Sequence, residues 1–210
     1  QDAAVLDELR GLGVELVDAA DKTFGGWGDS VGMFWRFLVA DDEDVERFLC
    51  IDADSRLSER QARGVQEWER SGYMAYATRD SRWHIIHPMS GGMWGCVGNC
   101  VPDIEPRIAN WFGRYEADFL ADMEFLQKMI YPEIYDSLLM HDSFSCLEYD
   151  TAVPWPTTRL CTPNYCECVG RKFLANDTRF DDAIEIEFFG PQRHGPAPLR
   201  CRRQPAAEFG

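Results

Sequence analysis

An apolar run that leads directly into two aspartates constrains the fold of this chain more than any other feature. Phe48-Leu49-Cys50-Ile51 is followed at once by Asp52-Ala53-Asp54. A short apolar run bounded by polar residues is typical of a buried strand, which we predict to be central in a parallel sheet. Ligands of open α/β sheets bind at the carboxyl ends of the strands, so both carboxylates are expected at a ligand site.

The residues after this strand predict a βαβ unit. Ser58 is a suitable helix N-cap, and Gly72 ends the helix predicted over 59–71. Residues 74–78 are typical of a second strand, which ends in Arg79-Asp80, and residues 33–39 predict the crossover helix before the first. We therefore predict an α/β fold with a central, mostly parallel sheet flanked by helices.

Weaker patterns complete the expected organisation. Residues 3–12 have the spacing of an amphipathic helix, and residues 14–17 alternate like a strand. A doubly wound domain normally begins with a strand, so we expect the chain to lack a first βα unit. Residues 118–139 predict two helices separated at Pro132, and residues 184–189 an edge strand.

One domain is predicted over residues 1–190, followed by a disordered tail over 191–210 that is rich in Pro, Gly and Arg. The net charge of −15 argues against a nucleic-acid partner. No run of 18 apolar residues is present, so we predict no membrane span. A cytoplasmic location is the default expectation. The eight cysteines could be free thiols, disulfides or ligands of a zinc site. Because disulfides form in oxidising compartments, a location in the secretory pathway also remains open.

Asp52 and Asp54 are the first candidate metal ligands. Residues i and i+2 of a strand share one side, so the two carboxylates can reach one cation. Oxygen ligands suit Mn²⁺ or Mg²⁺, which would attract a phosphorylated ligand to this acidic chain. A solvated pair of loop aspartates is the alternative interpretation.

Several motifs together resemble a known enzyme group. In chain order they are FWRFL, FLCIDADSRLSER, RDSRWH, GGMWG, HDSF and a VG-x-x-F element, over roughly residues 31–175. They resemble nucleotide-sugar-dependent glycosyltransferases of bacterial polysaccharide synthesis and of large algal viruses. The resemblance implies a GT-A-like (Rossmann-like) fold. It also implies transfer of a sugar from a nucleotide diphosphate sugar, with UDP-sugar the expected donor, to a glycan or other acceptor.

The resemblance also implies roles for individual residues. Asp52 and Asp54 match the DxD motif and would hold Mn²⁺ or Mg²⁺ against the donor diphosphate, with His141 as the third ligand. Asp142 would be a catalytic base or an acceptor contact. The residues implied in binding the donor and its sugar are Asp52, Arg56, Arg79, Asp80, His84, Gly91, Gly92 and Trp94.

Structural roles remain open for four of these residues. Trp94 could belong to the core beside a tight turn, and His84 could be a hydrogen-bonded structural histidine. Arg56 could pair with a nearby acid, and His141 could interact with the dipole at a helix end.

Two other functions remain open. A phosphohydrolase of the haloacid-dehalogenase type also has an apolar strand ending in Asp-x-Asp; Asp52 would be its nucleophile and Asp54 its acid and base. That reaction requires a later lysine and a second acidic pair at a strand end. The chain could also be an inactive nucleotide- or sugar-binding domain.

Overall fold

A computed structural model describes residues 3–24, 29–81, 84, 86–115, 119–143, 149–162 and 165–174. The edge strand predicted over 184–189 and the tail predicted over 191–210 lie outside these residues. None of the described helices is long and apolar enough to cross a membrane.

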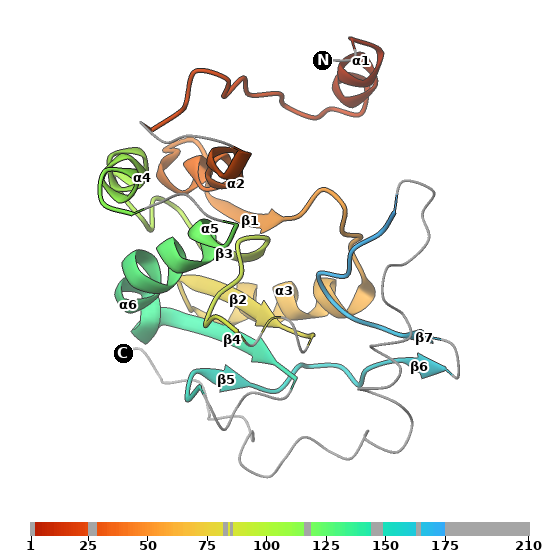
Figure 1. Cartoon of the computed structure of the whole chain (residues 1–210). Coiled ribbons are helices and arrows are strands. Elements are labelled where there is room, and N and C mark those ends of the chain that lie inside the picture. The colour runs from red at the N-terminus through yellow and green to blue at the C-terminus, as the bar shows by residue number, and fades with distance from the viewer. Residues whose placement is uncertain are drawn as a thin grey trace.

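Five strands form one mixed sheet in the order β1-β3-β2-β4-β5 (Figure 1). Strand β3 runs antiparallel to both β1 and β2, whereas β2, β4 and β5 are parallel. The carboxyl ends of β1, β2 and β4 therefore lie at one edge. The strands are β1 (Arg47–Ile51), β2 (Ala75–Arg79), β3 (Met93–Val97), β4 (Leu138–Asp142) and β5 (Ala152–Val153).

The α/β class is confirmed, but the predicted position of the first strand was wrong. Strand β1 is at the end of the described sheet, and its neighbour β3 is antiparallel. Gly95 permits this pairing, because a Cβ atom there would lie 2.2 Å from the Phe48 carbonyl oxygen. The last three residues of the GGMWG motif thus form the start of strand β3.

Helix α3 (Glu59–Ser71) matches its prediction at both ends. The Ser58 hydroxyl accepts a hydrogen bond from the Gln61 amide at 3.1 Å, and Gly72 ends the helix with a φ of 76°. The helix predicted over 33–39 is instead two short pieces. The remaining helices are α1 (Ala3–Gly11), η1 (Asp29–Val31), α2 (Gly32–Trp35), η2 (Leu38–Asp41), α4 (Ile104–Phe112), α5 (Ala121–Phe125), η4 (Leu126–Ile130), α6 (Tyr131–Ile134) and η5 (Tyr135–Ser137).

Pro132 interrupts the predicted helix pair as expected. The residues before it, Leu126–Ile130, form a wider π-helical turn. Proline lacks the amide proton that a regular helix needs and its ring clashes with the preceding turn, so the hydrogen-bond pattern changes there.

The sheet separates two layers. Trp68 of α3 packs with Tyr76 and Leu139 on one face. The larger core on the other face includes Ala77 and Met140 from the strands, together with side chains from α2, α4 and α5. Neighbouring strand residues face opposite ways, so β2 and β4 supply both layers.

The segment before the core is less buried. Helix α1 has no buried residue and lies away from the sheet (Figure 1). Residues 14–17, predicted as a strand, form none, and Val17 is 79% exposed. Alternation over four residues without a pairing partner did not produce a strand.

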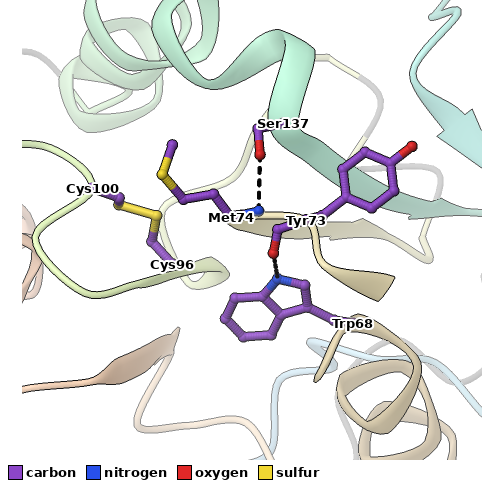
Figure 2. The surroundings of a disulfide bond; sticks show 6 residues. All are labelled: Trp68, Tyr73, Met74, Cys96, Cys100 and Ser137. Atoms are coloured by element: carbon purple, nitrogen blue, oxygen red, sulfur yellow. Dashed lines mark hydrogen bonds between the residues drawn. A yellow bond between two sulfur atoms is a disulfide. The ribbon is translucent and has the colours of Figure 1, made fainter. Parts of the chain in front are cut away.

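A disulfide joins Cys96 of β3 to Cys100 in the turn that follows (Figure 2). Met74, the residue before β2, extends toward it, and the Met74 amide donates to the Ser137 hydroxyl at 2.9 Å. Cys50 is a free, buried thiol, and Cys168 is also buried. Disulfides persist in oxidising compartments, so this one does not support the expected cytoplasmic location. Beyond the sheet, β6 (Cys161–Thr162) pairs with β7 (Tyr165–Cys166).

Candidate functional site

Asp52, directly after β1, belongs to a three-membered ionic group. Arg36 pairs through Nη1 with Asp52 Oδ1, and its Nη2 lies 3.2 Å from Asp122 Oδ2. Asp52 is 44% exposed, whereas Asp122 is almost fully buried. Burial raises the pKa of Asp122, although Arg36 opposes the shift. The predictions did not include Arg36 or Asp122; the only signal was the place of Arg36 in the FWRFL motif.

Gly91 and Gly92 make room for this ionic group. A Cβ atom at Gly91 would lie 2.3 Å from Asp122 Oδ2, and one at Gly92 would lie 2.3 Å from Asp52 Cγ. Both distances are shorter than the contacts that real Cβ atoms make, so a side chain at either position would clash with the carboxylate. The two predicted glycines are therefore at the site, and they lie against its carboxylates.

A C-terminal segment, residues 168–173, crosses Asp54. The Phe173 amide donates to the Asp54 carbonyl at 2.7 Å, and Lys172 Nζ lies 3.4 Å from Asp54 Oδ2. The guanidinium group of Arg56 lies over the Phe173 ring, 5.2 Å from its centroid. Lys172 thus lies beside the second aspartate of the motif, and Arg56 packs on the same segment.

Asp80 is fully buried, and both of its carboxylate oxygens are occupied. Oδ1 accepts from Arg60 Nη2 at 3.1 Å, from Arg159 Nη2 at 2.5 Å and from the Ser143 hydroxyl. Oδ2 accepts from Arg60 Nε and from the Val169 amide, each at 3.0 Å. Burial alone would raise the pKa of Asp80, but Arg159 and Arg60 hold it below the usual range. The structure thus places Asp80 as the anchor of the C-terminal segment, with no open acceptor for the predicted sugar hydroxyl.

His84 is held in one tautomer. Its Nδ1 accepts hydrogen bonds from the backbone amides of Asp80 at 3.2 Å and Ser81 at 3.1 Å. Burial lowers the pKa of His84 to about 4. At neutral pH the proton therefore resides on Nε2. The imidazole lies beside Gly170, where a Cβ atom would be 3.3 Å from Cε1.

Arg79 and Asp142 form a buried pair at the carboxyl ends of β2 and β4. Arg79 Nε lies 2.5 Å from Asp142 Oδ2, and Nη1 donates to the Pro88 carbonyl at 3.2 Å. The guanidinium group also lies 3.9 Å from the centre of the Tyr149 ring. Asp142, the predicted base, thus lies at the carboxyl edge of the sheet, where it forms a salt bridge with Arg79, a predicted donor-binding residue.

His141 lies on the opposite face of the sheet from this pair. Its Nδ1 is 3.0 Å from the Tyr76 hydroxyl, and its Nε2 is 3.5 Å from a Glu67 oxygen. Neighbouring residues of a strand face opposite ways, so His141 faces α3 while Asp142 faces away from it. The structure does not bring His141 to Asp52 and Asp54, and the dipole interaction at a helix end does not apply either, because the residue is in β4.

Trp94 also lies away from the site. Its side chain is fully buried, with ring centroids 5.8 Å from Phe37 and 5.1 Å from Phe48. This position agrees with the structural alternative that the sequence left open, namely a tryptophan in the core. Trp94 is therefore left out of the candidate site.

The described residues fit a cation only in part. Among them, no group of three histidine, cysteine or acidic side chains is arranged to hold a metal ion. Asp52 and Asp54 nevertheless offer two half-exposed carboxylates. Mg²⁺ is commonly bound by one or two carboxylates together with substrate phosphates, so the pair fits a cation that arrives with a diphosphate.

Comparisons of the chain with protein-family models, with curated proteins and with solved structures find no match. The function of the chain is therefore inferred from the site itself. That site combines a carboxylate pair, two adjacent cations, a neutral imidazole donor and a close glycine backbone at one edge of the sheet.

Proposed function

We propose that this chain is a metal-dependent glycosyltransferase, which moves a sugar from a nucleotide diphosphate sugar, with UDP as the expected nucleotide, to a glycan or other acceptor. One observation carries the proposal. The residues of four separate motifs, namely Asp52, His84, Gly92 and Asp142, meet where β1, β2 and β4 end. Ligand sites of α/β sheets lie at this edge.

The side chains divide the expected work between them. Asp52 and Asp54 would hold Mn²⁺ or Mg²⁺, which supplies positive charge to the departing diphosphate. Lys172 and Arg56 would add positive charge near it. His84 would donate from Nε2 to a sugar hydroxyl, and Gly91 and Gly92 leave room for the carboxylates of Asp122 and Asp52.

Calorimetry with UDP and UDP-sugars, with and without Mn²⁺, tests the proposal. We expect binding that requires Mn²⁺ and that weakens more than about tenfold in Asp54→Asn. Asp44→Asn, in an exposed acidic turn, is the matched control and should bind like the wild type. If no nucleotide binds in a metal-dependent way, the proposal fails.

One observation favours the phosphohydrolase alternative. Lys172 lies 3.4 Å from Asp54, which provides the later lysine that such a reaction requires. In that reaction Asp52 would attack the phosphorus atom and Asp54 would protonate the leaving alcohol. Against it, Arg36 already pairs with one of the two carboxylate oxygens of Asp52. Release of phosphate from p-nitrophenyl phosphate, lost in Asp52→Asn, would favour this function over sugar transfer.

A further inference from the structure

Each carboxylate of the Asp52–Asp54 pair already contacts a cation that the protein supplies. Arg36 Nη1 contacts Asp52, and Lys172 Nζ lies 3.4 Å from Asp54. These two basic side chains come from widely separated parts of the chain. The two contacts differ in how firmly the cation is held.

Arg36 is held firmly. Its Nη2 binds Asp122, its Nε donates to the Met33 carbonyl at 2.9 Å, and its guanidinium group lies 5.9 Å from the centre of the Phe37 ring. If Arg36 moved away, the buried carboxylate of Asp122 would lose its partner, which is costly. The guanidinium group is therefore fixed beside Asp52.

The contact between Lys172 and Asp54 is weak. Its side chain is 58% exposed, and the acid that it contacts is itself half-exposed. Ion pairs of this kind contribute little to stability and are screened by salt. Lys172 can thus exchange Asp54 for another anion at small cost.

We propose that Arg36 and Lys172 are internal counter-ions that keep free divalent cations off Asp52 and Asp54, so that metal binding depends on the nucleotide diphosphate. The inference rests on the proposed function and makes Arg36 a specificity-determining residue. A free cation must enter beside a guanidinium group that cannot leave, and like charges repel at this distance. A diphosphate brings negative charge that balances the divalent cation and the basic side chains together.

Titration of the whole chain with Mn²⁺ alone, followed by the electron paramagnetic resonance signal of free Mn²⁺, tests the inference without measuring activity. We expect Arg36→Met to bind Mn²⁺ about tenfold more tightly than the wild type, and Lys172→Met about threefold more tightly. Arg47→Met removes the same charge at the other end of β1, and Lys128→Met removes an exposed lysine that pairs with Glu124. Both controls should stay within about twofold of the wild type.

The outcomes are distinct. If Arg36→Met binds Mn²⁺ no better than Arg47→Met, the inference is overturned. If Arg36→Met does not fold, the variants of the two exposed lysines provide the test. Equal Mn²⁺ affinities for Lys172→Met and Lys128→Met would also overturn the inference. Adding UDP should tighten Mn²⁺ binding most in the wild type. An absent UDP effect in every variant would reject the proposed function, while the titrations with Mn²⁺ alone would still test the counter-ions.

Discussion

Arg79 and Asp142 lie opposite each other on parallel strands and form an ion pair in which neither side chain is exposed. The pair joins β2 to β4 where both strands end. A second contact supports the junction, since the Ser143 amide donates to the Arg79 carbonyl at 3.0 Å. The edge of the candidate site is thus set by a buried charge pair.

Removing one member of this pair should destabilise the fold strongly. Arg79→Met leaves a buried carboxylate without its partner, so we expect a loss of about 3–5 kcal/mol in the free energy of unfolding, measured by urea denaturation. Arg63→Met, which breaks an exposed pair with Glu59, should cost less than about 1 kcal/mol. Equal losses would show that burial of the Arg79–Asp142 pair has no energetic consequence.

Gly92→Ala should impair the site. The added Cβ atom would lie 2.3 Å from Asp52 Cγ, so the carboxylate must move away from Arg36. We expect the affinity for UDP with Mn²⁺ to fall more than about tenfold in calorimetry. Gly113→Ala, whose added atom meets only ordinary contacts of 3.5 Å or more, is the control and should bind normally. Unchanged binding by Gly92→Ala would remove Asp52 from the site.

His84 should make stability depend on pH. Its pKa is about 4 in the folded state and 6.5 in the unfolded chain, so the unfolded state takes up the proton first as the pH falls. Stability should therefore be full above about pH 7 and decline toward pH 4, with about 1 kcal/mol lost between pH 6.5 and about pH 5.5.

The comparison with His84→Asn isolates this contribution. The amide oxygen of the substituted side chain can still accept from the backbone, but the amide does not titrate. Urea midpoints of the variant should decline less over the same pH range. Parallel declines in the two proteins would contradict the assignment.

The Cys96–Cys100 disulfide should contribute modestly to stability, and it should protect both cysteines from thiol labelling. The loop between Cys96 and Cys100 is short, so replacing both by alanine should lower the free energy of unfolding by about 2 kcal/mol. Burial raises the pKa of Cys50 to about 12, so this thiol should resist iodoacetamide in the native state. After unfolding without reductant, mass spectrometry should find Cys50 labelled and the disulfide pair unlabelled. Labelled Cys96 would disprove the bond.

The parts of the fold that sequence could predict are those with local signals. Helix α3 has a capping serine and a terminating glycine, and both ends were predicted correctly. The order of strands has no local signal, because Phe48 pairs with Cys96 across a long separation. For the same reason, the insertion of β3 beside β1 could not be predicted.

The candidate site shows the same division. The Asp-x-Asp was predicted at the carboxyl end of a strand, and the structure places Asp52 and Asp54 directly after β1. They lie in a turn, closed by the Ser55 amide donating to the Asp52 carbonyl at 2.9 Å, and not on one side of the strand as predicted. The environment of Asp80 could not be predicted, because one arginine that encloses it lies 79 residues away. The face of β4 on which His141 lies depends on the register with β2, which the sequence alone does not state.

The enclosure of Asp80 has a consequence for how this sequence can change over time. Arg60 and Arg159 approach the same carboxylate from different parts of the chain. Losing the acid alone would leave two buried guanidinium groups without the carboxylate that both of them contact, and losing one arginine would leave the buried acid with a single cationic partner among the two. Relatives should therefore carry all three residues together or replace all three together.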